Sequence, residues 1–173
     1  MIDLKTFIRD IPDFPKPGIV FKDITPLLAD ATAFRTMIEA LVAPNRGRVD
    51  LVLGIESRGF IIGAAAALAL GTGIAIVRKP GKLPYRTHRA TYDLEYGTDT
   101  LEIHHDAVTG GHRVLLIDDL LATGGTASAA IALVERCGGR VAACAFVIEL
   151  VKLGGRARIA PHEVHALVRY EGA

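Results

Sequence analysis

Residues 114–126, VLLIDDLLATGGT, combine side-chain types that together could bind a sugar phosphate. An apolar run leads into two adjacent carboxylates, Asp118 and Asp119, which we expect at the C-terminal end of a buried strand. Ligands of open α/β sheets bind at that end of the strands. Two neighbouring carboxylates there could accept hydrogen bonds from the two hydroxyls of a ribose diol.

The loop after the carboxylates has the composition of a phosphate site. Gly124 and Gly125 allow close backbone approach and positive φ angles. We expect them to open a helix whose free N–H groups and dipole would face an anion, and Thr123 and Thr126 add hydroxyl donors. Diol acceptors beside a monophosphate cradle describe a ribose 5-phosphate site. The plainer alternative is a strand–turn–helix with a solvated pair of aspartates.

Other segments narrow the chemistry. The loop has neither the lysine of a P-loop nor the GxGxxG spacing of a dinucleotide site. Residues 54–60, GIESRGF, form a second strand-to-helix turn that would present Arg58 to an anion, unless Glu56 and Arg58 simply pair at the surface. Residues 78–90, RKPGKLPYRTHRA, contain five Lys or Arg, two prolines and one glycine. We expect a mobile basic loop there; the alternative is an ordinary solvated loop.

The elements that would position these residues alternate between strand and helix patterns. Apolar runs predict strands at 51–55, 74–77, 114–117, 141–149 and 163–170, and a hairpin at 91–96 and 100–104. Helices are predicted at 4–8, from an N-cap at Thr25 to Pro44, at 60–70, and from the glycine loop to about Cys137. This order predicts an α/β fold with a central, mostly parallel sheet flanked by helices, in a single domain over residues 1–173.

Composition limits the class of protein. The 173 residues are 50% apolar and 23% charged, with a formal net charge of +1. So small a charge gives no general attraction to nucleic acid or to an anionic membrane, and the longest apolar run, residues 60–70, is too short to span a bilayer. The N-terminus lacks the apolar core of a signal peptide. With Cys137 and Cys144 expected to be reduced core thiols, the sequence favours a cytoplasmic enzyme.

The 114–126 segment resembles the motif with which type I phosphoribosyltransferases bind phosphoribosyl pyrophosphate (PRPP). Three further segments narrow the resemblance to the adenine-specific members: 13–26, 54–60, and 78–84 followed by 92–97. The resemblance covers about residues 10–170. The resemblance implies the type I fold, with a small hood formed by residues 1–34 and by a flexible loop and hairpin at 78–104. It also implies that adenine and PRPP give AMP and pyrophosphate, and that the chain forms a homodimer whose 78–90 loop reaches toward the partner subunit.

The resemblance assigns a role to each candidate site residue. Ribose and 5-phosphate binding falls to Asp118, Asp119, Ala122, Thr123, Gly124, Gly125 and Thr126; pyrophosphate binding to Glu56, Ser57, Arg58, Arg78 and Lys82; and adenine binding to Val20, Phe21 and Lys22. Glu95 would be catalytic, donating a hydrogen bond to N7 of the purine. A cis peptide is implied between Glu56 and Ser57. Mg²⁺ would be held mainly by PRPP and water, with Asp118 as the candidate protein ligand.

Two alternatives stay open from the sequence. The first is a PRPP-sensing regulatory module like some purine repressors, although we expect too few residues before Thr25 for a DNA-binding domain. The second is a phosphoribosyltransferase for xanthine, or for hypoxanthine and guanine, whose 6-oxo group needs a donor where adenine needs an acceptor. Residues 14–21, FPKPGIVF, favour adenine by resemblance.

Overall fold

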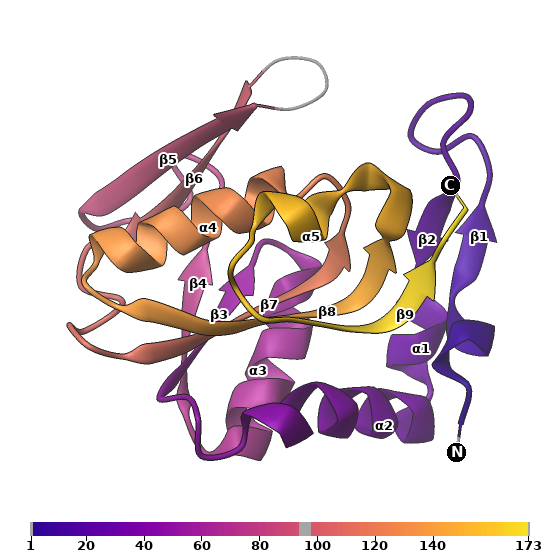
Figure 1. The fold of residues 1–173 in the computed structure, drawn as a ribbon, viewed down its shortest axis with the longest axis horizontal. Coiled ribbons are helices and arrows are strands. Elements are labelled where there is room, and N and C mark those ends of the chain that lie inside the picture. Colours follow the sequence, from indigo (N-terminus) through magenta and orange to yellow (C-terminus); the bar gives the residue numbers. More distant parts are fainter. Residues whose placement is uncertain (1, 94–97, 173) are drawn as a thin grey trace.

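A five-stranded, entirely parallel sheet forms the centre of the molecule. The computed structural model describes residues 2–93 and 98–172 (Figure 1). The strand order is β4-β3-β7-β8-β9. The bounds are β3 (Leu51–Ile55), β4 (Gly73–Val77), β7 (Arg113–Leu121), β8 (Arg140–Leu150) and β9 (Val164–Tyr170). The predicted α/β fold with a parallel sheet is confirmed, and every strand predicted for this sheet is present.

Helices cover both faces of the sheet because the buried strands alternate apolar side chains to either side. Along β7, Leu115 and Ile117 pack in one core with α2 (Ala31–Val42) and α3 (Arg58–Leu70). Val114 and Leu116 pack in the other core with α4 (Gly125–Arg136). Figure 1 shows α2 and α3 on one side of the sheet, and α4 with the short α5 (Gly155–Arg158) on the other.

The helix predicted from Thr25 to Pro44 is divided in two. α1 (Thr25–Ala29) ends at Asp30, and the carboxylate of Asp30 then caps α2 by accepting the N–H groups of Thr32 and Ala33 at 3.0 and 2.8 Å. The prediction that Thr25 is an N-cap is wrong, since Ile24 holds that position. Apolar residues continue at helical spacing through the break, because α1 and α2 pack into the same core. The sequence pattern therefore does not show where one helix ends and the next begins.

Strand bounds differ from the prediction at two places that concern the candidate site. β7 runs on to Leu121, so the acidic pair lies inside the strand, where Asp118 pairs with Phe146 of β8. The hairpin strands are β5 (Thr87–Asp93) and β6 (Thr98–His104). The last four residues of the predicted basic loop, 87–90, therefore belong to β5.

The N-terminal segment and the hairpin lie at opposite ends of the molecule in Figure 1. After η1 (Leu4–Phe7), β1 (Arg9–Ile11) pairs antiparallel with β2 (Phe21–Asp23) beside β9. The short elements η2 (Ala43–Asn45) and η3 (Val151–Leu153) complete the fold. Within residues 2–93 and 98–172, no helix has the length and apolarity needed to cross a membrane.

Both cysteines are free thiols. Cys144 is fully buried in the core next to α4, and burial raises the pKa of its thiol to about 12. Cys137 is partly exposed at the C-terminal end of α4, and burial also raises the pKa of its thiol. Both groups therefore stay protonated at neutral pH, as expected for structural thiols.

Candidate active site

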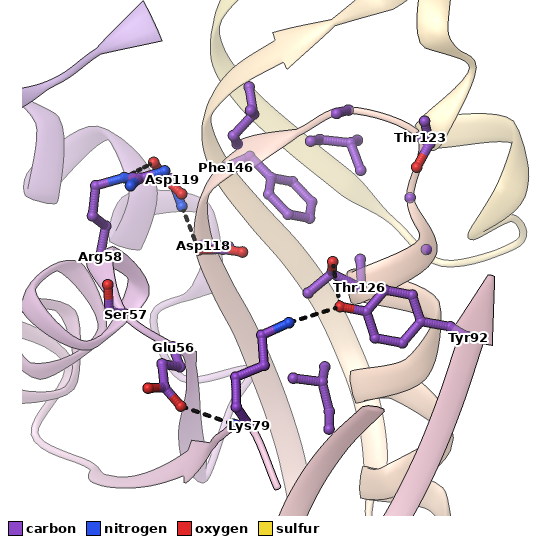
Figure 2. A pocket seen from close by; sticks show the side chains of 17 residues that line it. Glu56, Ser57, Arg58, Lys79, Tyr92, Asp118, Asp119, Thr123, Thr126 and Phe146 are labelled. Carbon is purple, nitrogen blue, oxygen red and sulfur yellow. Dashed lines mark hydrogen bonds and ion pairs between the residues drawn. The ribbon is translucent and has the colours of Figure 1, made fainter. Parts of the chain in front are cut away.

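A cavity of about 320 Å³ opens at the carboxyl ends of β3 and β7 (Figure 2). Ten of the sequence-predicted residues line it: Glu56, Ser57, Arg58, Asp118, Asp119, Ala122, Thr123, Gly124, Gly125 and Thr126. Seven more were not predicted: Lys79, Tyr92, Leu101, Leu120, Leu121, Ala127 and Phe146. The cavity lies where open α/β sheets bind their ligands.

The two aspartates in β7 have different surroundings. Asp119 is only 5% exposed and accepts a hydrogen bond from Nε of Arg58, at the start of α3. Asp118 is partly exposed, and its Oδ1 accepts the Asp119 N–H at 2.9 Å. Burial, followed by the charge of Asp119, raises the pKa of Asp118 well above its usual range. The pair thus offers carboxylate oxygens to a ligand, while the ionised form of Asp118 lowers the folding stability of the ligand-free protein.

The candidate phosphate loop, residues 122–126, joins β7 to α4, and its shape is set by the glycine backbone. Gly124 has φ = 79° and is the N-cap of α4, and none of the described side chains hydrogen-bonds to that cap. The first N–H groups of the helix are therefore left for a ligand, with the positive end of the helix dipole behind them. Figure 2 shows Thr123 and Thr126 on the same stretch of chain that borders the cavity.

A polar network joins Thr126 to Tyr92 and Lys79, which line the cavity wall opposite β7 and α4. The sequence analysis did not predict this network. Thr126 donates its hydroxyl to the Tyr92 hydroxyl at 3.2 Å, and Tyr92 donates to Asp99 at 3.2 Å. Lys79 forms an ion pair with the same carboxylate and lies 3.5 Å from the Tyr92 oxygen. Burial lowers the pKa of the Lys79 ammonium group, but the hydrogen bonds and charges of Asp99 and Tyr92 together outweigh burial and raise that pKa.

Glu56 does not pair with Arg58 as the plainer alternative supposed. It accepts hydrogen bonds from Nη2 of Arg78 at 3.1 Å and from the Lys79 N–H at 2.8 Å. The peptide between Glu56 and Ser57 is cis, as the resemblance implied. Arg78 and Lys82 do not line the cavity; Arg78 also donates to the Lys82 carbonyl at 3.3 Å. Glu56 therefore connects the turn at residues 78–82, the start of the basic loop, to the rim of the cavity.

The predicted adenine-binding residues lie outside the cavity. Val20 is 47% exposed, and the ring of Phe21 lies 5.3 Å from the Arg58 guanidinium. Lys22 pairs with Asp10 at 2.7 Å and lies over the Tyr170 ring. The predicted catalytic residue, Glu95, lies outside the described residues.

Comparison with known proteins identifies the family that the chain resembles. The family model "Phosphoribosyl transferase domain" matches residues 23–166. Adenine phosphoribosyltransferase of Syntrophotalea carbinolica is 57% identical over 98% of this chain and its own full length.

Two solved structures extend the comparison. Adenine phosphoribosyltransferase of Thermoanaerobacter pseudethanolicus has a TM-score of 0.94 at 52% identity, covering 96% of this chain and 98% of its own. The Saccharomyces cerevisiae enzyme, complexed with adenine and an imino-altritol bisphosphate, has a TM-score of 0.89 at 40% identity, covering 95% and 96%. The chain belongs to the phosphoribosyltransferase family, among the adenine phosphoribosyltransferases.

Proposed function

We propose that the cavity beside Asp118 and Asp119 is where the chain carries out the reaction of its family. In that reaction adenine displaces pyrophosphate from C1 of PRPP, giving AMP and pyrophosphate in purine salvage. One observation carries the proposal: a single cavity joins the acidic pair, the phosphate loop, and two cations, Arg58 and Lys79. Those features match a substrate that carries a diol, a monophosphate and a pyrophosphate.

The β7–α4 wall would bind the ribose 5-phosphate half of PRPP. Asp118 and Asp119 accept the ribose hydroxyls, while the N–H groups and threonine hydroxyls of Ala122–Thr126 surround the phosphate. This wall is built from a paired strand and a helix. It can therefore hold C1 in place as its bond to the leaving group breaks, which is a contribution of positioning and electrostatics.

The opposite wall would bind pyrophosphate. Ser57, Arg58 and Lys79 line the cavity directly, so they are the first candidates for contacts with the leaving group. Arg78 and Lys82 are next, and they would reach the ligand by an inward shift of the turn that Glu56 anchors. Closure of this turn would also exclude water, which could otherwise attack the same sugar carbon.

The purine would lie toward the N-terminal segment, where backbone groups near Val20 would read its edge. Phe21 supports this placement because its ring already contacts Arg58 at the cavity. The ion pair of Lys22 with Asp10 fits a role in holding the segment in place. Adenine must lose its N9 proton, and Glu95, protonated and donating to N7, would ease that loss. Glu95→Gln should lower turnover and preserve the affinity for PRPP; turnover near wild type would remove Glu95 from the mechanism.

Mg²⁺ fits this donor set as a substrate-borne ion. Within the described part of the chain, no three His, Cys, Asp or Glu side chains form a cluster that could hold a metal alone. Three carboxylates line the cavity, and Glu56 already accepts from Arg78 and Lys79, which leaves Asp118 and Asp119 as the candidate ligands. Mg²⁺ accepts one or two carboxylates together with phosphates and waters. When bound with PRPP, the ion would neutralise charge on the departing pyrophosphate.

A homodimer and a cytoplasmic location complete the proposal. The outer face of α3 exposes Ile61 and Leu68, which are 50% and 84% exposed, and Ile74 on the edge strand β4 is 39% exposed. A second copy on this face would lie next to the turn that follows β4 and begins at Arg78. Light scattering should give twice the 18.4 kDa of one chain, and Leu68→Lys should halve that mass. The two free thiols suit a reducing compartment.

The reaction itself is tested by supplying PRPP and Mg²⁺ with adenine, hypoxanthine, guanine or xanthine in separate assays. Rapid AMP formation from adenine alone is the expected result. Product from a 6-oxopurine would overturn the assignment of the base. If no base gave product while PRPP still raised the melting temperature, the regulatory alternative would replace the enzyme.

A further inference from the structure

The phosphate loop rests directly on the backbone of α5. A Cβ atom on Gly155, the first residue of α5, would lie 2.3 Å from the Ala122 carbonyl oxygen and 3.0 Å from the Gly124 nitrogen. In the other direction, a Cβ atom on Gly124 would lie 2.7 Å from the Gly155 carbonyl oxygen. Two glycines from distant parts of the chain therefore bring two backbones into contact with no space for a side chain.

α5 is in turn held by a charged cluster outside the cavity. Arg156 donates from Nε and Nη2 to the two carboxylate oxygens of Glu149 at 3.0 and 2.6 Å. Its Nη1 donates to the Val164 carbonyl at 2.8 Å, which ties α5 to β9 as well. Glu149 is 3% exposed, and the hydrogen bonds from Arg156 lower the pKa of its carboxyl. Arg169 adds a second contact to the same carboxylate at 3.3 Å.

The register of the sheet connects this cluster to the loop. Glu149 of β8 is paired with Leu121 of β7, and Leu121 immediately precedes the loop. The same Leu121 side chain would be 2.9 Å from a Cβ atom on Gly155. Figure 1 shows α5 at the end of the sheet where α4 begins. The loop is thus bounded by β7 on one side and by α5 on the other.

We propose that Glu149 and Arg156 are positioning residues for the phosphate loop. The loop is short of side chains that could hold it from behind, since Gly124 and Gly125 have none. Its rear contact is the Gly155 backbone, and the Glu149–Arg156 pair sets where that backbone lies. A shift of α5 would move the N–H groups that surround the phosphate. This inference rests on the proposed role of residues 122–126 in binding the 5-phosphate.

A selective effect on phosphate-bearing ligands distinguishes positioning from general stability. Arg156→Lys keeps the charge but loses the two-point contact with Glu149. We expect KM for PRPP and Kd for ribose 5-phosphate to rise about tenfold, because a small displacement of positioning groups costs one to two orders of magnitude. KM for adenine should stay within roughly twofold. Glu149→Gln breaks the pair from the other partner and should give the same pattern.

Arg113→Lys is the matched control. Arg113 also binds both oxygens of one carboxylate, that of Asp50, at 2.9 and 2.6 Å, but at the opposite end of the strands. This variant should leave both phosphate-dependent constants unchanged. All variants are assayed well below their measured melting temperatures, so that the constants describe folded protein.

A loop variant, Thr126→Val, separates failure of this inference from failure of the proposed function. If Thr126→Val weakens ribose 5-phosphate binding and neither Arg156→Lys nor Glu149→Gln does, α5 does not position the loop and the inference is overturned. Equal losses for PRPP and adenine in the two α5 variants would also overturn it, because they would indicate a purely structural role. If no variant, Thr126→Val included, alters ribose 5-phosphate binding, the loop is not the phosphate site and the proposed function fails with the inference.

Discussion

The two walls of the cavity are built in different ways. The β7–α4 wall comes from one continuous segment, residues 113–136, whose acidic pair and glycine loop are placed by sheet pairing and by a helix start. The opposite wall draws Arg58, Lys79 and Tyr92 from three elements, and ion pairs and hydrogen bonds position them. One wall is set by backbone structure, whereas the other depends on side chains that can exchange partners. The difference would suit PRPP, because its ribose 5-phosphate half would stay bound while its pyrophosphate leaves.

Removing the acidic pair should have the largest effect on the first wall. Asp118→Asn with Asp119→Asn removes both anionic acceptors for the ribose diol, and it also leaves Arg58 without its partner. We expect PRPP to produce no rise in melting temperature. Asp50→Asn, which breaks an exposed ion pair far from the cavity, is the control. An undiminished PRPP-dependent shift in the double variant would refute the diol assignment.

On the second wall, loss of Lys79 should have a larger effect than loss of Lys82. Lys79→Ala removes a cation that lines the cavity, and we expect kcat/KM for PRPP to fall about 100-fold, as for other preorganised charged groups. Lys82 lies outside the cavity, so Lys82→Ala should lower kcat/KM by roughly tenfold or less. Steady-state kinetics at saturating adenine compares the two. The reverse order of effects would show that the turn rearranges far more than proposed.

Tyr92 contacts both walls, so its hydroxyl tests how strongly they are coupled. Tyr92→Phe keeps the buried ring but removes the group that accepts from Thr126 and donates to Asp99. KM for PRPP should change by roughly fivefold, the equivalent of one net hydrogen bond. Tyr85→Phe serves as the control, because Tyr85 is 55% exposed on the basic loop. Unchanged kinetics would mean that the two walls act independently.

The smallest expected effect concerns the stability of the ligand-free protein. The raised pKa of Asp118 means that its ionised form costs folding free energy once the pH exceeds the unfolded value of about 3.9. Asp118→Asn should therefore melt a few degrees higher at pH 7, with a gain that shrinks as the pH falls and vanishes below that value. Calorimetry from pH 3 to 8 measures the difference. A variant that melts lower at every pH would contradict the stated environment of Asp118.

The two walls also differ in how far the sequence predicts them. The β7–loop–α4 wall was found from sequence because its signals are local: an apolar run, two carboxylates and a double glycine within 13 residues. Sheet pairing extended β7 past the carboxylates, which local pattern could not show. The parallel sheet followed from the alternation of strands and helices.

The second wall was only partly predictable because its contacts join distant residues. The basic segment was identified, but nothing in its sequence distinguished Lys79 from its neighbours Arg78 and Lys82. The difference depends on distant partners: Asp99, twenty residues away, pairs with Lys79, and Glu56 holds Arg78 at the rim. Tyr92 falls within the predicted hairpin strand 91–96, and its hydrogen bond with Thr126 has no local sequence signature.

A crystal structure of the chain with AMP tests the central claim most directly. The account predicts the 5′-phosphate at the N–H groups of residues 124–126, and both ribose hydroxyls within hydrogen-bond distance of Asp118 and Asp119. The purine should extend toward Phe21. A phosphate bound elsewhere, with the loop at the start of α4 empty, would contradict the assignment of both walls.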